Sequence, residues 1–152
     1  MKVVRLADCS ETPWRNGGGR TRELLVWPGA SDWQVRVSVA EIEADGPFSP
    51  YPGIDRWFAV LAGAGVVLTL PQGEVTLRPG SAALAFAGEA APACRLIDGP
   101  TQDLNLMLRR GARTAWHGVF DGDTLHWSDD ADEALPALRG WRVGSDGMER
   151  IA

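Results

Sequence analysis

Polar and aliphatic side chains alternate along two stretches of the sequence. In WQVRVSVAEIEA, Arg36 and Ser38 alternate with three valines, and in DLNLMLRR, Asp103 and Asn105 alternate with three leucines. A period of two predicts a strand with one apolar face and one polar face. The polar face meets water in most such sheets, but in a closed barrel it can line a cavity. In a cavity, the planar fork of an arginine would hold a carboxylate and the smaller polar groups would orient the rest of the ligand.

Two further segments offer contacts of the same kind. Asp55 and Arg56 precede a predicted strand, where they either form a local ion pair or add a second arginine to the site. The segment PWRNGGGRTREL holds three consecutive glycines, which permit positive φ and close approach of another backbone. It is either a bare turn or a wall of the cavity. In the second interpretation Arg36 and Arg56 contact the anion, Trp14 and Phe48 form walls, and the other candidate ligand-binding residues are Asn16, Thr21, Ser38, Asp103 and Asn105.

Motifs for phosphate, nucleophilic and metal chemistry are incomplete. The string NGGGRT lacks the Gly-Lys-Ser/Thr ending of a P-loop, and GAGVVL has Leu68 where a dinucleotide fingerprint has its third glycine. No serine lies in a GxSxG elbow. The two histidines, His117 and His126, could form a metal site only with Asp121 or Asp123, and such a site needs three or four ligands. We therefore expect no nucleotide, no metal and no other cofactor.

The composition fits one domain with a full hydrophobic core. The chain has 152 residues, of which 45% are hydrophobic, and a net charge of −5. Six acidic residues lie between Asp121 and Glu133 with no Lys or Arg among them, and no basic face for a nucleic acid is visible. Cys9 and Cys94 do not form a CxxC pair, and no segment is apolar enough for a signal peptide or a membrane span. We therefore expect a reduced, cytoplasmic protein that binds neither nucleic acid nor membrane.

Glycine and proline divide the chain into short segments with strand patterns. Alternation predicts strands within residues 33–44, 56–70, 73–86, 103–110, 124–128 and 140–144. The second and third of these segments are predicted hairpins, turning at Gly63–Gly65 and at Pro79–Gly80. One short helix is predicted within residues 129–140, where Pro136 limits its length. Together these elements predict an all-β sandwich or barrel with few short helices.

Three long blocks of sequence indicate a family. The strings WRNGGGRTREL, RVSVAEIEADGPFSPYPGIDRWFAVLAGAGVVL and LIDGPTQDLNLMLRR resemble the HutD/Ves family over residues Val4 to Arg110. The resemblance implies a cupin-like β-barrel with two cupin-like halves in one chain (a bicupin). It also implies a small-molecule binding protein or regulator associated with bacterial histidine utilisation. The suggested ligands are formylglutamate-like or urocanate-like carboxylates, and no established catalytic activity comes with the family.

The chain departs from ordinary cupins in two respects. Metal-binding cupins carry an HxH pair before a glycine hairpin and a third histidine after a Pro-Gly turn. The corresponding segments, GIDRWFAVLAG and SAALAFAGEA, contain no histidine, so the resemblance implies a metal-free cupin. Only residues 111–152 follow the matching part. We therefore predict a single cupin-like domain over residues 1–152, with residues 1–110 as its main part and residues 111–152 as a reduced second cupin half.

The leading hypothesis is a metal-free, cupin-like binder of a small carboxylate that regulates histidine utilisation. The alternative is a metal-independent cupin isomerase or hydrolase, with Asp103 or Glu41 as its base. A third interpretation is a protein-partner module that uses exposed tryptophans. A homodimer is expected only by analogy with other cupins.

Overall fold

The computed structural model describes residues 1–151, and its regular elements are almost all strands. In this part of the chain the strands are interrupted by two 3-10 helices of three residues each, and none of the helices is long and apolar enough to cross a membrane. The elements are β1 (Lys2–Arg5), η1 (Leu6–Asp8), β2 (Glu11–Pro13), β3 (Gly19–Trp27), β4 (Val35–Ile42), β5 (Gly46–Pro47), β6 (Ile54–Ala62), β7 (Val66–Leu70), β8 (Gly73–Leu77), β9 (Leu84–Ala87), η2 (Gly88–Ala90), β10 (Ala93–Leu96), β11 (Thr101–Arg109), β12 (His117–Asp121), β13 (Thr124–Ser128), β14 (Gly140–Gly144) and β15 (Gly147–Ile151). The predicted all-β class with few short helices is confirmed.

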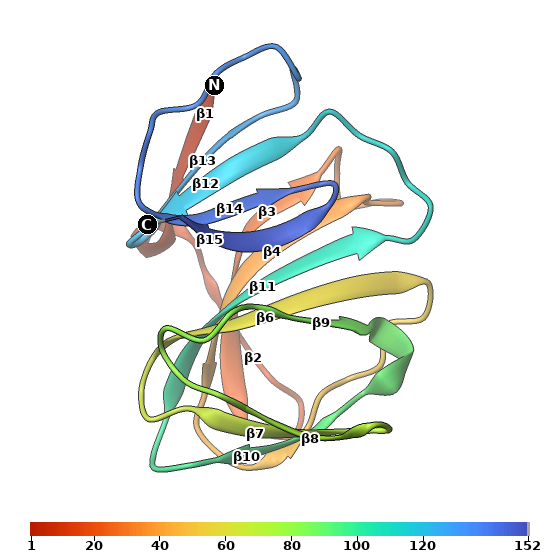
Figure 1. The fold of residues 1–152 in the computed structure, drawn as a ribbon, viewed down its shortest axis with the longest axis vertical. Helices are drawn as coiled ribbons and strands as arrows, with labels where there is room; N and C mark the ends of the chain where they lie inside the picture. Colours follow the sequence, from red (N-terminus) through yellow and green to blue (C-terminus); the bar gives the residue numbers. More distant parts are fainter. Residues whose placement is uncertain (152) are drawn as a thin grey trace.

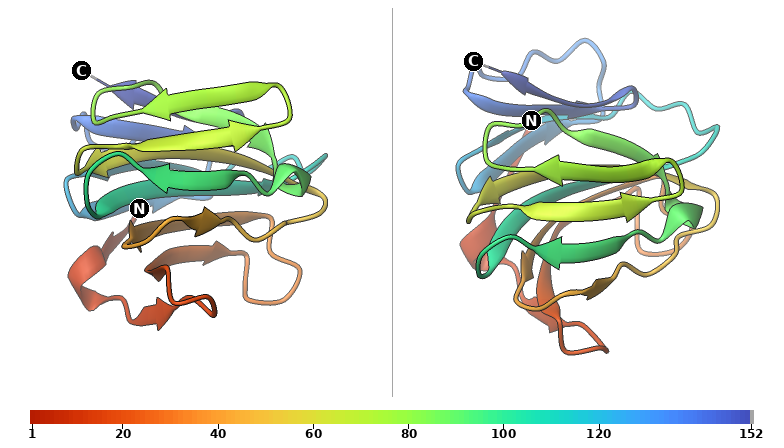
Figure 2. Two further views of the ribbon diagram at one scale, coloured as in Figure 1. Left: turned by 90° about the horizontal axis from the view of Figure 1, so that it is seen from below. Right: turned by 60° about the horizontal axis from the view of Figure 1, so that its bottom comes forward.

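The strands form three antiparallel sheets that follow one another along the long axis of the molecule (Figure 1). A five-stranded sheet, β1-β13-β12-β14-β15, lies at one end, and a six-stranded sheet, β2-β3-β4-β11-β6-β9, lies in the middle. The left view of Figure 2 shows the four-stranded sheet, β5-β10-β7-β8, in front of the other two. Within residues 1–151 the three sheets do not join into one continuous hydrogen-bonded barrel. A cavity for a ligand would therefore lie between two facing sheets.

Alternation along β4 and β11 assigns successive residues to two different cores. The odd-numbered valines of β4 and the even-numbered leucines of β11 face the five-stranded sheet, where they pack with Trp116, Phe120 and Trp141 in the first core. The intervening residues face the four-stranded sheet, where Phe58 and Leu68 belong to a second core. Each large side chain buried in this way stabilises the fold by about 1.5–3 kcal/mol. The middle sheet therefore supports a core on each face.

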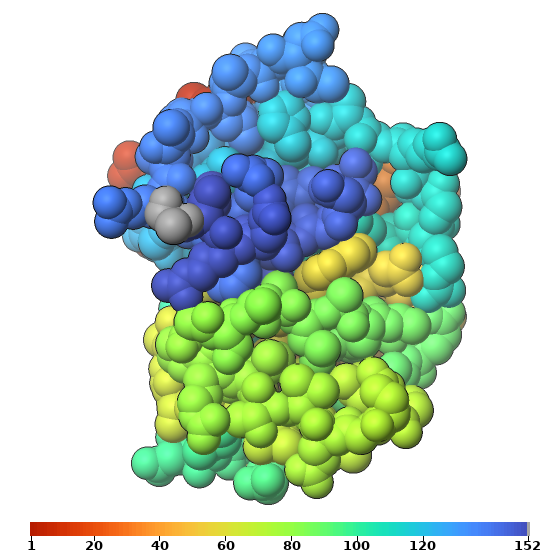
Figure 3. Space-filling model, viewed as in Figure 1, coloured from red at the N-terminus to blue at the C-terminus, as the bar shows by residue number. Residues whose placement is uncertain are grey.

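The five-stranded sheet joins the two ends of the chain. The N-terminal strand β1 pairs with β13, from Lys2 opposite Trp127 to Arg5 opposite Thr124. On the face shown in Figure 3, the dark blue residues of β14 and β15 lie against the yellow and green residues of the middle part of the chain. Among the C-terminal strands, β13 therefore has the N-terminal strand β1 as a neighbour, and this sheet shares the first core with the six-stranded sheet.

Both predicted hairpins are wrong, because the chain changes sheets at each of these turns. β6 belongs to the six-stranded sheet and β7 to the four-stranded sheet, and β8 and β9 are separated in the same way. At the first turn, a Cβ on Gly63 would lie 2.6 Å from the carbonyl oxygen of Pro100, so only glycine fits this crossing. The hairpin that does form joins β7 to β8, with Val66 opposite Leu77.

The predicted short helix within residues 129–140 is also wrong, because residues 129–139 form an irregular loop. Short polar side chains form turns at the start of this segment: Ser128 Oγ accepts a hydrogen bond from the Asp130 amide, and Asp130 Oδ1 accepts one from the Asp132 amide, each at 3.0 Å. Pro136 has no amide hydrogen to continue a helix. The backbone carbonyl of Glu133 instead lies 2.9 Å from Nε2 of His117.

Candidate ligand-binding site

A cavity of about 450 Å³ lies against the face of the six-stranded sheet that carries the alternating polar residues. Strands β3, β4, β11 and β6 form its floor, and parts of residues 12–16 and 47–51 form its walls. The structure brings eight of the nine predicted ligand-binding residues to this one cavity. They are Trp14, Asn16, Thr21, Arg36, Ser38, Phe48, Arg56 and Asn105.

Strand register arranges the floor in two rows. Glu23, Ser38, Asn105 and Phe58 are consecutive partners across β3, β4, β11 and β6. In the next row, Met107 lies between Arg36 of β4 and Arg56 of β6. Directly opposed residues in antiparallel strands point to the same face. The two arginines are therefore held on one surface with a single strand between them.

Arg56 is the buried cation of the site. Only 5% of the residue is exposed, and its guanidinium carbon lies 5.1–5.3 Å from the ring centres of Phe48, Tyr51 and Phe86. One nitrogen, Nη2, donates to Oδ1 of Asn105 at 3.3 Å, while Nε and Nη1 have no hydrogen-bond partner among residues 1–151. No carboxylate in this part of the chain forms an ion pair with the group. Such a cation is unusual in a folded protein, because buried charges are normally paired.

Burial also affects the pKa of Arg56. Loss of solvation lowers the pKa of Arg56 to about 10, and the nearby Arg36 acts in the same direction, whereas Tyr51 opposes the change. The guanidinium is still protonated at neutral pH. Its three aromatic neighbours compensate part of the lost hydration through cation–π contacts. The rings provide neither a hydrogen-bond acceptor for the free nitrogens nor a counter-charge, and an anionic ligand would provide both.

Arg36 has protein partners and stands nearer the cavity mouth. Its Nε donates to Oε1 of Glu23 at 3.0 Å, and its Nη1 donates to the hydroxyl of Tyr51 at 3.4 Å. The Glu23 side chain is 47% exposed, so this ion pair is open to water. Arg36 is therefore largely neutralised, whereas Arg56 is a buried arginine that lacks a counter-charge.

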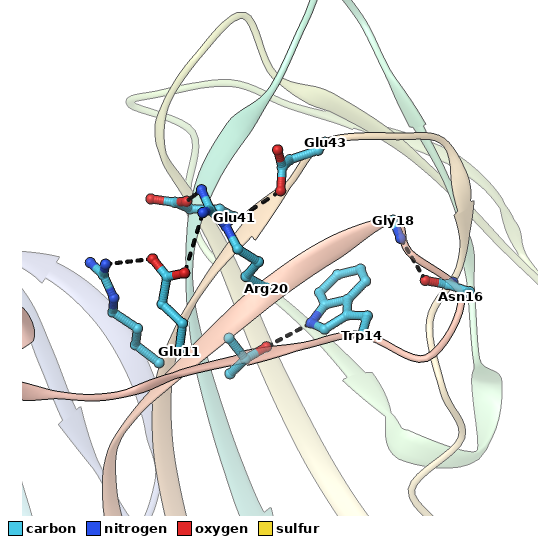
Figure 4. Close-up of polar contacts among 9 residues, drawn as sticks. Glu11, Trp14, Asn16, Gly18, Arg20, Glu41 and Glu43 are labelled. Atoms are coloured by element: carbon cyan, nitrogen blue, oxygen red, sulfur yellow. Dashed lines mark hydrogen bonds and ion pairs between the residues drawn. The ribbon is translucent and has the colours of Figure 1, made fainter.

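The glycine segment borders the cavity, which is lined by Trp14, Asn16 and Thr21. Figure 4 shows how Trp14, Asn16 and Gly18 of this segment lie. Trp14 Nε1 donates to Thr21 Oγ1 at 2.7 Å, which fixes the indole as a wall. Asn16 Oδ1 accepts from the amide of Gly18 at 2.8 Å, so its amide nitrogen remains for another partner. A Cβ on Gly19 would lie 2.4 Å from the carbonyl oxygen of Glu41, which shows why the backbone needs glycine at this point. The segment is thus a cavity wall rather than a bare turn.

Asp103 is the predicted ligand-binding residue that does not line the cavity. It shares the polar face of β11 with Asn105, but lies deeper, between Ala40 and Val60. It is fully buried, and its Oδ2 accepts from Thr101 Oγ1 at 2.9 Å. Burial raises the pKa of Asp103 to about 7, although the Thr101 hydrogen bond opposes this shift. Alternation therefore predicts which face of the sheet Asp103 occupies, but it does not predict how far along the strand the cavity extends.

The other acidic candidates have partners away from the floor. Glu41 points to the opposite side of its strand, where it pairs with Arg20, and Figure 4 shows both residues in a network with Glu11 and Glu43. Asp55 pairs with Arg110 at 3.0 Å rather than with its neighbour Arg56. The local Asp55–Arg56 ion pair considered from the sequence does not form, which leaves Arg56 for the cavity.

Sequence reasoning missed three important residues of the site. Met107 and Glu23 follow from alternation, because each lies two positions from a predicted residue on the same strand. Tyr51 contacts Arg36 and Arg56 but belongs to a segment without strand periodicity. No pattern in the sequence distinguishes it from a surface loop residue.

The residues of the cavity do not fit a divalent metal ion of the kind that many cupins hold. Its lining contains three arginines and a single carboxylate, Glu23, with no His or Cys. Zinc and iron sites need several imidazole, thiolate or carboxylate donors. Among residues 1–151, no cluster of three or more His, Cys, Asp or Glu side chains forms a site of that type. No step of a mechanism is therefore assigned to a metal.

Solved structures define the class of fold. The chain is similar to the cupin domain of an XRE family transcriptional regulator from Enterobacter cloacae, with a TM-score of 0.51 and 18% identity over 63% of this chain and 99% of that domain. It is more similar to HutD from Pseudomonas fluorescens SBW25, described as a formate condition, with a TM-score of 0.79 and 28% identity over 88% of this chain and 90% of that one. The fold is therefore cupin-like.

Sequence comparison gives the family. The sequence model of the HutD family matches residues 6–150, so the chain belongs to the HutD family. It is 36% identical over 134 residues to an uncharacterized 21.2 kDa protein in the hutC 3' region of Pseudomonas putida. It is 38% identical over 118 residues to protein Ves of Cronobacter sakazakii. These matches cover 84% and 71% of this chain, but only 68% and 60% of the two relatives.

Proposed function

We propose that this protein binds a small carboxylate in the cavity, with Arg56 as the anchor of the carboxylate. The observation that carries the proposal is the buried guanidinium with two unpartnered nitrogens and no counter-charge among residues 1–151. A carboxylate beside the guanidinium would accept a hydrogen bond from Nε or from Nη1 and would neutralise the charge. Charge-assisted bonds of this type contribute about 1.5–3 kcal/mol each.

The rest of the cavity suits a short, flat ligand. Trp14 and Phe48 meet edge to face with ring centres 6.5 Å apart, so they give the cavity an apolar side. Ser38 and Asn105 lie on the floor, and the amide nitrogen of Asn16 lies at the rim. A small number of polar groups in a mostly apolar concavity is the usual composition of a small-molecule site.

Membership of the HutD family favours an acid of histidine breakdown, formylglutamate-like or urocanate-like, and a regulatory role. The Pseudomonas putida relative is named for its position in the hutC 3' region, and the structure of Pseudomonas fluorescens HutD is of a formate condition. The first name agrees with a link to histidine utilisation and the second with a small acid as the ligand. Because this chain is shorter than its relatives, any function of their additional residues is not extended to it.

A metal-independent enzyme has less support than a binding protein. Its base would have to be Asp103, which lies outside the cavity lining, or Glu41, which pairs with Arg20 on the opposite side of the strand. A general base must come within hydrogen-bond reach of the proton it removes. Neither carboxylate meets that condition for a ligand anchored at Arg56.

Calorimetric titration of urocanate, N-formylglutamate and formate into the wild type and Arg56→Met tests the proposal. We expect at least one of the acids to bind the wild type and its affinity to fall at least about tenfold in R56M, since a charge-assisted pair is lost. Thermal unfolding at about a hundred times the dissociation constant should show an added stability of roughly 2.7 kcal/mol in the wild type alone.

Arg109→Met is the matched control, because Arg109 is an arginine outside the cavity whose guanidinium carbon lies 5.7 Å from the ring centre of Trp33. This variant should bind as the wild type does. Binding of none of the acids at millimolar concentration, or equal binding by R56M and the wild type, would overturn the proposal.

A further inference from the structure

Tyr51 is a cavity residue that contacts Arg36 and Arg56. Its hydroxyl accepts from Arg36, and its ring centre lies 5.3 Å from the guanidinium carbon of Arg56. It belongs to the irregular segment between β5 and β6, so no strand ladder holds it in place. The backbone hydrogen bonds of its segment are made outside the cavity, to η2 and to the end of β11.

A network on the outer surface holds this segment. The amide of Tyr51 donates to the carbonyl of Gly88 at 2.9 Å, and the amide of Gly53 donates to Oε2 of Glu89 at 3.0 Å. The amide of Arg110 donates to the carbonyl of Gly53 at 2.8 Å. The segment is thus tied at two points to η2 and at one point to the end of β11.

Arg110 and Glu89 close the network. The guanidinium donates to both oxygens of Glu89, at 2.8 and 2.9 Å, and through Nε to Asp55 at 3.0 Å. The hydrogen bond from Arg110 holds the pKa of Glu89 far below its usual range, so the pair is charged at every pH of interest. Both side chains are nearly half exposed, and exposed pairs contribute little to global stability. Their effect is local, on a segment that has few other restraints.

We propose that Arg110 and Glu89 are positioning residues that hold Tyr51 against Arg36 and Arg56 and thereby complete the cavity wall. The consequence for affinity rests on the proposed function, whereas the positioning itself does not. Suppose that loss of the pair leaves Tyr51 in this position in only about one molecule in ten. The apparent dissociation constant then rises about tenfold, because only those molecules bind the ligand.

The sequence provides a direct probe, since Tyr51 is the single tyrosine of the chain. Full-length protein labelled with 3-fluorotyrosine will show one fluorine resonance, which reports the surroundings of Tyr51. We expect this resonance to move in ligand-free Arg110→Ala and Glu89→Ala. In the double variant it should move no further than in either single variant, because the two side chains act as one unit. The denaturation midpoints should stay near that of the wild type.

The control is Arg142→Ala, which removes an exposed arginine paired with Glu149 on the five-stranded sheet. Its resonance should match the wild type. A ligand-free resonance unchanged in R110A and E89A would overturn the positioning role. Titrations with urocanate, N-formylglutamate and formate then separate the two ideas: if the wild type binds none of these acids, the proposed function fails, and the ligand-free spectra still decide the role of the pair. Equal affinity of R110A and the wild type for an acid that binds would overturn the consequence for the cavity.

Discussion

Arg56 lies among aromatic rings and has lost most of its hydration, so the residue that we propose as the ligand anchor is unfavourable for stability. Burying an unpaired charge is expensive, and apolar replacements of buried charges are often neutral or stabilising by about 1–4 kcal/mol. The fold keeps this charge without a protein counter-ion in residues 1–151. A conflict of this kind is typical of functional sites.

Arg56→Met should therefore be as stable as the ligand-free wild type, or more stable by on the order of 1 kcal/mol. The methionine sulfur can contact the same three rings. Asn105 loses a donor but faces the cavity, where water can replace it. Urea denaturation in carboxylate-free buffer measures the difference, with Arg109→Met as the control. A loss of more than about 2 kcal/mol would mean that Arg56 serves mainly to build the fold.

Asp103 predicts a pH dependence of stability. Its pKa is raised from 3.8 in the unfolded chain to about 7 in the folded protein. Between these values the folded state binds a proton that the unfolded state has released, so stability falls as pH rises from about 4 to about 7 and is level above that. Three units of pKa correspond to roughly 4 kcal/mol as an upper limit.

Asp103→Asn removes this titration and keeps a partner for Thr101. The difference in free energy of unfolding, wild type minus D103N, should therefore decrease between pH 4.5 and pH 7. Urea denaturation at pH 4.5, 6 and 8 measures it. A difference that instead grows with pH would show that Asp103 is stabilised as a carboxylate in the folded protein.

For single residues, the sequence predicts which face of the sheet a side chain occupies better than it predicts which groups surround that side chain. Arg36, Ser38 and Asn105 follow from alternation, because a strand must turn every second side chain to the same face. Asp103 follows the same rule and still misses the cavity, since the position of the four-stranded sheet decides where the open space ends. Tyr51 and Glu89 were not predicted, because their places depend on contacts between distant segments.

Among the elements, the glycine segment that leads into β3 sets how closely β3 approaches β4. Gly19 is opposite Ile42, and a Cβ at this position would also meet the indole of Trp14. Gly18 has more room, because the nearest atom to a Cβ added there would be Asn16 Oδ1, at 3.1 Å. The close approach expected from the three glycines is therefore concentrated at the third.

Gly19→Ala should destabilise the protein by about 1–3 kcal/mol, since the Cβ would overlap a backbone oxygen that cannot move without shifting β4. Gly29→Ala is the matched control, because its Cβ would meet no atom within 4 Å and its φ is not positive. Chemical denaturation of both variants measures the difference. Equal stability of the two would show that β3 and β4 separate easily at this point.

The strands were easier to predict than their partners. Residues 33–44 contain β4 and residues 103–110 overlap β11, as their periodicity requires. The glycine turns between β6 and β7 and between β8 and β9 resemble hairpin turns in sequence, yet each carries the chain to another sheet. A turn motif fixes the local backbone but not which strands pair, because pairing depends on long-range packing.

For the molecule as a whole, two cores on opposite faces of one sheet should have separable roles. Phe120 is buried in the first core, and Phe58 is buried in the second core and lines the cavity. Phe120→Leu should lower the free energy of unfolding by about 1–3 kcal/mol and leave the affinity of the folded protein unchanged. Phe58→Leu should lower both. Denaturation and calorimetric titration of the two variants with urocanate test this, and a clear loss of affinity in F120L would show that the cores are coupled through the sheet.

The alternation along β4 and β11 has a consequence for how such a protein can change. Because neighbouring residues face different cores, substitutions at Ser38, Asn105 and Met107 alter the cavity without changing Val37 or Leu106. A library that randomises only these three floor positions would keep the whole of the first core. The six-stranded sheet therefore allows the lining of the cavity to change in redesigned variants while the first core stays the same.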